Sequence, residues 1–402
     1  MRTLLHHRFN RVADRIVRPQ MSWQKRPVSS FHLCGCTGLV LAIAIAAWLA
    51  TRQHLSLWVV AGTIVAAVIT FPSVVMITKI LTGEERIIYY HHEIAVVLVT
   101  TLLLFLLREP PLPYLDLTIL GIGTFLALGR VGCFMVGCCH GRPHSWGVCY
   151  RREHTDAGFP PYYVGVRLFP VQLVESLWVL CAVIVGSYFV IRGDPPGAAL
   201  AWYVVAYDLG RFTFEFMRGD PERPYVWGFS QPQWISVILL WCVAGAELAG
   251  ILALHRWHLA AAAGLTLSMI VIALKRRFQR AAKFLLLHPR HVREIAEMID
   301  LSNPLDGALP SCRWTVFARP ASPQQEIRVG CTSLGILVSA SKTRLASQLI
   351  EHFALSGLDG EMSEESARSL FEIITRLARS ENAGQLVRGK RGVFHLLIRQ
   401  GA

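Results

Sequence analysis

Long apolar runs constrain this chain more than any other feature of its sequence. A helix of about 20 apolar residues crosses a hydrocarbon core of ~30 Å, and the chain contains such stretches at intervals over most of its length. Hydrophobic residues make up 53% of the 402 residues and charged residues only 17%, which excludes an ordinary soluble protein of this length. The stretches lie at about residues 31–50, 55–81, 92–107, 114–137, 170–191, 196–217, 232–254 and 257–274. The sequence therefore predicts an all-α polytopic membrane protein with about seven or eight transmembrane helices.

Basic residues gather on both sides of these stretches. The first 30 residues carry seven arginines and lysines against one acidic residue, Asp14, and a second basic run extends from Lys275 to Lys283. We expect these side chains, which contribute much of the net charge of +13, to face anionic lipid headgroups of the cytoplasmic leaflet rather than nucleic acid. The N-terminal segment is longer than a usual signal peptide, so we expect it to remain in the mature protein.

The composition changes after about residue 290. Charged residues become frequent, no stretch is long enough to span a membrane, and alternating segments such as RWTVFARP and EIRVGCTSLGILVSA are separated by SPQQ. We expect a helix over about 342–355, a second helix after a cap at Ser363, and a closing strand VFHLLIRQ. About 100 residues can bury their own core. The predicted organisation is a basic tail over 1–30, a transmembrane domain over 31–275, and a basic linker with a small soluble α/β domain over 276–402.

Several predicted spans contain ionisable side chains, each of which costs about 2.5–3.5 kcal/mol near the centre of a bilayer. In the sixth span Asp208, Arg211, Glu215 and Arg218 are three or four residues apart and share one helix face. That face is unsuited to lipid. The structural alternative is an Arg211–Glu215 pair that neutralises itself, with Arg218 extending to the membrane surface.

The fifth and third spans also begin with polar residues. Gln172 and Glu175 lie three apart on one helix face close to the membrane surface, either as an ordinary polar helix end or as part of a site. His91 and His92, followed by Glu93, begin the third span. They either contact lipid headgroups or take part in proton transfer, for which histidine is suited near neutral pH.

Residues 129–141 read GRVGCFMVGCCHG and place Arg130 near the end of the fourth span. A second interpretation of this region treats its cysteines and histidines as metal ligands or reactive thiols, because five such residues lie within twelve positions: Cys138, Cys139, His140, His144 and Cys149. Adjacent Cys138 and Cys139 lack the two-residue gap that is usual in zinc sites. We therefore expect inert thiols, with no metal and no cofactor.

Six separated blocks, in order, resemble the prolipoprotein diacylglyceryl transferase family. The blocks are YYHHEIAVV, GRVGCFMVGCCHG, WGVCY, FPVQLVE, YDLGRFTFEFMRGDPE and SQPQWIS, and they cover about residues 85–250. The N-terminal tail, the eighth span and the C-terminal domain lie outside the resemblance. The resemblance implies a multi-pass enzyme of the bacterial inner membrane. Such an enzyme moves a diacylglyceryl group from phosphatidylglycerol to the thiol of a lipobox cysteine in a preprotein and releases glycerol phosphate.

The same resemblance implies roles for individual residues. Arg130 and Arg211 match family arginines and would hold the phosphate, because a guanidinium fork binds phosphate oxygens bidentately; Glu215 would orient Arg211. His91 or His92 matches the family's histidine and is the candidate base or positioning group. The candidate substrate-binding residues are Tyr207, Gln172, Glu175, Arg218, Gly132 and Gly141. For the two glycines, tight helix packing is the alternative explanation.

The chain departs from the family pattern at four positions. Cys133 and Cys138 stand where the family signature has asparagine and glutamate, Phe169 replaces a histidine, and Val174 replaces a tyrosine. Three explanations stay open. Another acid, such as Glu175 or Glu93, replaces the carboxylate of the family's glutamate; the chain uses a different acceptor; or the chain lacks the family reaction. A non-catalytic phospholipid-binding scaffold or a transporter is the alternative from a different class, because such proteins also use paired charges inside a membrane.

Charge and resemblance disagree about orientation. Basic clusters at both ends of the spanning region predict that both termini and the C-terminal domain are cytoplasmic, whereas the family's orientation places the N-terminus outside. With eight spans the two ends share one side of the membrane. We also expect the loop over 138–168 to lie on that side, together with its arginines.

Overall fold

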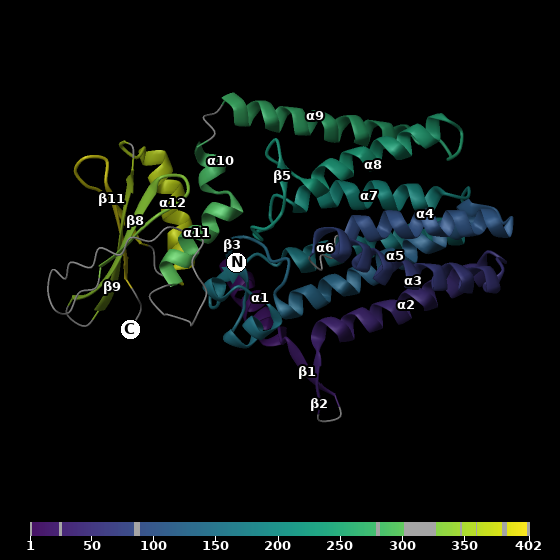
Figure 1. The fold of residues 1–402 in the computed structure, drawn as a ribbon, viewed down its shortest axis with the longest axis horizontal. Coiled ribbons are helices and arrows are strands. Elements are labelled where there is room, and N and C mark those ends of the chain that lie inside the picture. The colour runs from purple at the N-terminus through teal and green to yellow at the C-terminus, as the bar shows by residue number, and fades with distance from the viewer. Residues whose placement is uncertain are drawn as a thin grey trace.

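The structure is a computed structural model that describes residues 2–23, 26–83, 89–278, 282–300, 327–345, 348–358, 360–379 and 384–399. Long helices run side by side and form most of the molecule (Figure 1). They are α2 (Ser30–Arg52), α3 (Leu57–Thr82), α4 (Tyr89–Leu107), α5 (Pro111–Val136), α6 (Val171–Arg192), α7 (Ala198–Phe214), α8 (Gln231–Leu248) and α9 (Arg256–Phe278). Each helix overlaps one predicted apolar stretch; α8 ends six residues before its predicted limit, and the other limits agree to within four residues.

Six of these helices, α2 to α6 and α9, are long and apolar enough to cross a membrane. The other two differ in composition or length. Helix α7 has only 17 residues and contains buried Asp208 and Arg211, and α8 opens with Gln231-Pro232-Gln233. The fold is therefore mostly helical with six candidate membrane spans.

One end of the bundle collects most of the other structure (Figure 1). The segment between α5 and α6, residues 137–170, lies there and is called the head segment below. It contains β3 (Pro143–Cys149), the short 3₁₀ helices η1 (Arg152–Ala157) and η2 (Pro161–Tyr163), and β4 (Arg167–Leu168), which pairs antiparallel with β3. Helix α1 (Arg2–Ile16) and the C-terminal sheet lie at the same end, which we call the head end. The head segment, α1 and the C-terminal sheet therefore lie at the same end of the helix bundle, and the side of the membrane that they occupy stays a prediction.

Helix α1 packs against β3 and lies within the segment that the sequence marks only as a basic tail. The backbone N–H groups of Gly147 and Cys149 donate hydrogen bonds of 2.9 and 2.8 Å to Asn10 Oδ1 and Asp14 Oδ1. Asp14 also forms an ion pair of 3.0 Å with Arg167 of β4. The hairpin β1 (Gln20–Trp23) and β2 (Arg26–Ser29) then leads into α2. Polar residues of α1 therefore bind the two short strands of the head segment.

The C-terminal part forms a five-stranded antiparallel sheet in the order β10–β11–β9–β8–β7. Its strands are β7 (Ile327–Cys331), β8 (Ile336–Leu345), β9 (Gln348–Gly357), β10 (Gln385–Arg388) and β11 (Phe394–Arg399). Helices α10 (Ala282–Leu286) and α11 (Pro289–Asp300) precede it, and α12 (Glu364–Leu377) separates β9 from β10. Helix α12 begins as predicted, with the Ser366 N–H donating to the Ser363 Oγ at 3.2 Å. The predicted closing strand is β11.

The predicted helix over 342–355 is wrong, because this segment belongs to the hairpin of β8 and β9. Burial alternates along β9: Glu351, Phe353 and Leu355 are buried, whereas His352 and Ala354 are less so. A period of two is the pattern of a strand with one face in a core. The segments RWTVFARP and SPQQ lie outside the described residues.

Two main apolar cores hold the molecule together. One lies within the helix bundle and includes Leu120, Val183 and Tyr203. The other lies at the head end and joins α1, the head segment, α11 and the C-terminal sheet; among its members are Ala13, Val148, Ile295, Leu370 and Leu396. The C-terminal sheet and its helices thus share a core with the head segment.

Candidate functional site

Arginines and carboxylates form a buried network where α5, α6 and α7 reach the head end. We call this set the arginine network: Arg130, Glu175, Arg211, Glu215, Arg218, Asp220 and Arg223. Arg130 comes from the last turns of α5, Glu175 from the start of α6 and Arg211 from the last turn of α7. Charges from three helices therefore meet at one place.

Glu175 connects the two arginines on which the sequence analysis depends. Its Oε2 lies 3.1 Å from Arg130 Nε, and both of its oxygens lie 3.4 Å from Arg211 Nη1. The exposed fractions are 7% for Arg130, 5% for Arg211 and 1% for Glu175. The Arg130 contact is an ion pair without the alignment of a hydrogen bond. Within the described part of the chain, no hydrogen bond from the terminal nitrogens of Arg130 is found, and its ion pair is with Glu175.

The second half of the network lies in the turn that follows α7. Arg211 Nη2 is 2.7 Å from Glu215 Oε1, and Glu215 also pairs with Arg223. Asp220 accepts from Arg218 at 2.9 Å and lies 3.1 Å from Arg223. Four guanidinium groups thus face three carboxylates, which leaves one positive charge in excess. A buried site of this kind favours an anion.

Asp220 lies outside the membrane-spanning helices. Its burial acts to raise its pKa, but the nearby Arg218 and Arg223 guanidinium groups outweigh this effect and hold the pKa at about 2. Its carboxylate is therefore ionised at every physiological pH.

The structure refines the predicted polar face of the sixth span. Helix α7 ends at Phe214, so Glu215 and Arg218 belong to the turn beyond it. The Arg211–Glu215 pair of the structural alternative is present, but Arg211 also reaches Glu175 on another helix. Arg218 is 5% exposed and paired with Asp220, so its side chain is buried within the protein.

Tyrosines continue the polar interior from the network toward α4 and α8. Tyr207 OH lies 3.5 Å from Glu175 Oε1. Tyr90 OH donates a 2.6 Å hydrogen bond to Asp208 and lies 2.8 Å from the Ser236 hydroxyl. The sequence analysis identified Tyr207 but missed Tyr90 and Ser236. The available signal was a tyrosine at the start of an apolar helix, because a buried phenol needs a hydrogen-bond partner.

The predicted histidines lie elsewhere on α4. The His92 ring stacks on Phe71 of α3, with ring centroids 4.2 Å apart, and His91 is half-buried. Neither histidine makes a hydrogen bond or an ion pair with the arginine network in the described part of the chain. Glu93, the alternative acid, is 5% exposed and is also outside the network. A role for either histidine as a base stays a prediction.

Gln172 and the two candidate glycines shape the backbone around the network. Gln172 Nε2 donates a 2.9 Å hydrogen bond to the Cys138 carbonyl. A Cβ atom on Gly141 would lie 2.3 Å from the Phe169 carbonyl oxygen, and one on Gly132 would lie 3.2 Å from Phe31 of α2. These close approaches are to other parts of the chain, which supports the packing explanation for both glycines.

Three thiols gather beside the network. The Sγ atoms of Cys133, Cys138 and Cys139 all lie within 4.8 Å of one another. Hydrogen bonds with Cys133 and Cys138 lower the pKa of Cys139 below its ordinary value, and the Arg218 and Arg130 guanidinium groups lower it further.

This group differs from the predicted set of metal ligands, of which only Cys138 and Cys139 come together. His140 bonds the Gly141 carbonyl at 2.9 Å, His144 bonds the Trp146 carbonyl, and Cys149 lies in β3. Cys133 was not in the predicted set. A cysteine in a helix followed by two cysteines in the next turn is not a familiar ligand spacing, so this group could not be recognised from the sequence.

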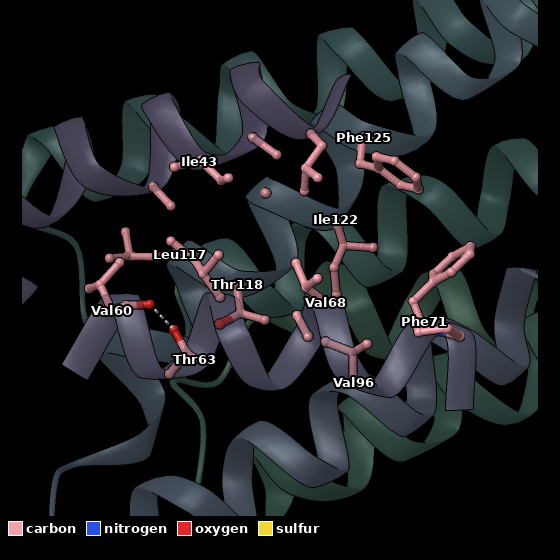
Figure 2. A pocket seen from close by; sticks show the side chains of 17 residues that line it. Ile43, Val60, Thr63, Val68, Phe71, Val96, Leu117, Thr118, Ile122 and Phe125 are labelled. Carbon is pink, nitrogen blue, oxygen red and sulfur yellow. Dashed lines mark hydrogen bonds between the residues drawn. The ribbon is translucent and has the colours of Figure 1, made fainter. Parts of the chain in front are cut away.

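An apolar pocket of about 250 Å³ lies between α2, α3, α4 and α5. Figure 2 shows Phe71 and Phe125 pointing toward each other across it, and their ring centroids are 5.7 Å apart. Most of its lining is aliphatic; Ile43, Val68, Val96 and Ile122 are examples. Helix α5 thus contributes Phe125 to the apolar pocket and Arg130 to the charged site.

Comparison with known proteins places this chain in a family. A family model described as prolipoprotein diacylglyceryl transferase matches residues 21–249, more than half of the chain. The chain belongs to this family. The resemblance read from six sequence blocks is therefore confirmed. The chain is a multi-pass membrane protein of a transferase family, and the match includes every residue of the arginine network.

Curated members of the prolipoprotein diacylglyceryl transferase family align with part of the chain. A phosphatidylglycerol-prolipoprotein diacylglyceryl transferase of Clostridium tetani is 31% identical over 131 residues, which is 32% of this chain and 50% of the relative. A similar protein of Clostridium perfringens is 30% identical over 127 residues, which is 31% of this chain and 47% of the relative. One of Streptomyces coelicolor is 31% identical over 152 residues, which is 36% of this chain and 45% of the relative. The chain thus spans about half the length of the curated relatives that it matches.

Proposed function

We propose that this chain transfers a diacylglyceryl group from phosphatidylglycerol to the thiol of a lipobox cysteine in a prolipoprotein. The relatives' names give both substrates. The observation that carries the proposal is the meeting of Arg130 and Arg211, from separate helices, on one buried carboxylate. This arrangement matches the need to hold one phosphate between two guanidinium groups.

The chemistry follows from the charges. The acceptor thiolate attacks the carbon of the diacylglyceryl group that is bonded to the phosphate oxygen, and this carbon–oxygen bond breaks with its electron pair moving to the phosphate oxygen. Glycerol phosphate leaves with one more negative charge than the diester carried. Arg130 and Arg211 stabilise that charge as it forms, with Glu215 holding Arg211 in place. Tyr207, Gln172, Glu175 and Arg218 maintain the polar surroundings.

The apolar pocket is suited to an acyl chain of the donor lipid. Its side chains are almost all hydrocarbon, and α5 lines it and also carries Arg130. A phospholipid needs an arrangement of this kind, because its charged and apolar parts are covalently joined.

We also propose that α7 and α8 cross the membrane, which makes eight spans, and that the chain lies in the bacterial inner membrane with its head end inside. Basic residues support this orientation: Arg8, Arg11 and Arg15 lie in α1, and Lys275, Arg276 and Arg277 lie in the last turn of α9. The domains are then a basic N-terminal segment over 1–30, a transmembrane domain over 31–275 and a cytoplasmic α/β domain within 276–402. In this orientation the lipobox cysteine meets the site at the cytoplasmic face.

Alanine variants test the proposed function. Arg130→Ala and Arg211→Ala should each reduce transfer by about 10²-fold or more, measured in vesicles as labelled diacylglyceryl on a lipobox peptide and as glycerol phosphate released. Arg192→Ala is the matched control, because Arg192 is exposed, pairs with Asp194 and lies at the opposite end of α6 from Glu175. Transfer at the wild-type rate by either site variant removes that arginine from the mechanism. Complementation of a cell depleted of its own transferase tests the same function in vivo.

A phospholipid-binding scaffold is the second candidate. Cys133 and Cys138 stand where the family signature has other residues, and Glu175 already occupies the space between the two arginines. A scaffold binds phosphatidylglycerol but releases no glycerol phosphate when a lipobox peptide is added.

A further inference from the structure

Three cysteines converge next to the arginine network in a geometry that suits a thiophilic metal ion. Cys133 lies in the last turn of α5, and Cys138 and Cys139 occupy the turn that follows. Their sulfurs are all within 4.8 Å of one another. In a tetrahedral zinc site with bonds of ~2.3 Å, sulfur atoms lie about 3.8 Å apart. Small side-chain adjustments therefore bring the three thiols to ligand distance.

The backbone around the thiols is held rigidly. Gln172 donates to the Cys138 carbonyl at 2.9 Å, and the Gly219 N–H donates to the His140 carbonyl at 2.9 Å. Cys139 has a positive φ of 52°, which is uncommon for a residue other than glycine. Contacts from α6 and from the turn after α7 thus fix this turn in the conformation that turns its thiols toward Cys133.

The surrounding charge suits a metal thiolate. A zinc ion with three thiolate ligands carries one net negative charge, and the arginine network has one positive charge in excess. Arg130 and Arg218 both interact electrostatically with Cys139. A free cation would be repelled here, whereas the complex as a whole is stabilised.

We propose that Cys133, Cys138 and Cys139 bind one zinc ion whose fourth position takes the acceptor thiol. This proposal rests on the proposed transferase function. Zinc sites that do chemistry keep one position open beside three protein ligands, and a thiol that coordinates zinc is deprotonated. Two of the three cysteines occupy the positions where the family signature has asparagine and glutamate. The metal then activates the acceptor thiol in the proposed transfer.

The step balances as follows. The acceptor thiol displaces water from zinc, and its proton passes to solvent. The zinc-bound sulfur forms a bond to the diacylglyceryl carbon that carries the phosphate, while the bond between that carbon and the phosphate oxygen breaks. The electron pair leaves with glycerol phosphate, the thioether product dissociates from zinc, and water returns to the fourth position. No oxidant or reductant is needed.

Metal content and cobalt spectroscopy test the site independently of activity. The full-length chain, purified in detergent with reductant and without chelator, should contain stoichiometric zinc that is lost in Cys133→Ser and in Cys139→Ser. Cys181→Ser, at an exposed thiol of α6, is the matched control and should keep the zinc. Circular dichroism and gel filtration check that each variant is folded. A wild-type protein without zinc that also takes up no cobalt overturns the proposal.

A second group of metal-ligand type requires its own control. Glu247, His255 and His258 lie close together where α8 meets α9, away from the head end. Cobalt at this group has nitrogen and oxygen ligands and lacks thiolate-to-cobalt charge-transfer absorption. The proposal therefore expects that absorption in His258→Gln and its absence in Cys133→Ser. The reverse result overturns the proposal.

The acceptor role has a separate readout. A lipobox peptide should change the cobalt charge-transfer spectrum, and the same peptide with serine in place of cysteine should not. Removing the metal should slow transfer by on the order of 10²-fold, the contribution usual for a general base, and added zinc should restore it. Undiminished transfer by metal-free protein overturns the zinc proposal and leaves the transferase function intact. Zinc binding without transfer by the wild-type protein instead overturns the transferase function and the acceptor role.

Discussion

Glu175 is the residue that holds the two central arginines together. Its carboxylate contacts Arg130 and Arg211 from a position that is 1% exposed. Without it, two buried guanidinium groups would face each other with less compensating charge. A phosphate that enters the site has the same charge sign and similar oxygen geometry. The proposed function therefore implies that Glu175 occupies the position that the donor headgroup would take.

Glu175→Gln tests this idea. Loss of the buried carboxylate should lower the free energy of unfolding by about 3–5 kcal/mol, because unpaired buried charges remain. Phosphatidylglycerol should raise the thermal midpoint more in this variant than in the wild type, since the lipid phosphate replaces the missing charge. Phosphatidylcholine vesicles are the control. Equal midpoint shifts in the two proteins would show that the headgroup does not bind between these arginines.

The stability of the fold should depend on pH through the carboxyl group of Asp220. Its pKa of about 2 is depressed from an unfolded value near 4 by Arg218 and Arg223, against the effect of burial. Ion pairing of Asp220 therefore stabilises the fold above about pH 4 by roughly 2 kcal/mol, and this contribution is lost as the pH falls toward about 2. In Asp220→Asn, the free energy of unfolding, measured by circular dichroism, should fall less steeply as the pH decreases from about 4 to about 2. Asp156→Asn, at an exposed position, should leave that dependence unchanged.

The sequence predicted the charged residues of the site better than its neutral ones. A charge in an apolar span is costly, so Arg130, Arg211 and Glu175 stand out without any knowledge of the fold. Tyr90 and the thiol of Cys133 carry no such cost and look like ordinary helix residues. Their roles depend on which helices become neighbours, and a single sequence does not encode that pairing locally.

Among the elements, α5 has the most demanding packing. A Cβ atom on Gly123 would lie 2.4 Å from the Tyr203 ring and 2.7 Å from Val183. Gly123→Ala should therefore destabilise the bundle by about 1–3 kcal/mol, the usual cost of overpacking. Gly245→Ala is the matched control, because nothing lies within 4 Å of its Cβ position. Thermal unfolding in detergent distinguishes the two variants, and an unchanged midpoint for Gly123→Ala would contradict the packing described here.

Element boundaries followed from the sequence where composition changes sharply. The ends of α2 and α6 lie within two residues of their predicted limits, because arginine stops each apolar run. The end of α7 and the hairpin of β8 and β9 were misread. In α7 the polar spacing continues past Phe214 although the helix does not. In β9 the spacing of apolar residues fits the period of a helix as well as that of a strand. The strand forms because this segment pairs with β8.

For the whole molecule, orientation is the property that the fold links most directly to chemistry. The head end contains the arginine network, both basic clusters and the C-terminal sheet. Alkaline phosphatase fused after residue 155 should be inactive and after residue 194 active, if basic residues set the topology. Green fluorescent protein at the same positions should give the opposite pattern. An active phosphatase at 155 would place the arginines outside, as in the family's usual orientation.

The shared core of the head end also determines when this region can finish folding. Residues near the start of the chain, such as Ala13, pack in one cluster with Leu396 and Ile398 near its end. A ribosome synthesises these segments far apart in time. Val148 and Leu168 of the head segment therefore stay incompletely covered until β11 has been synthesised. The head segment therefore reaches its native packing only after β11 has been synthesised.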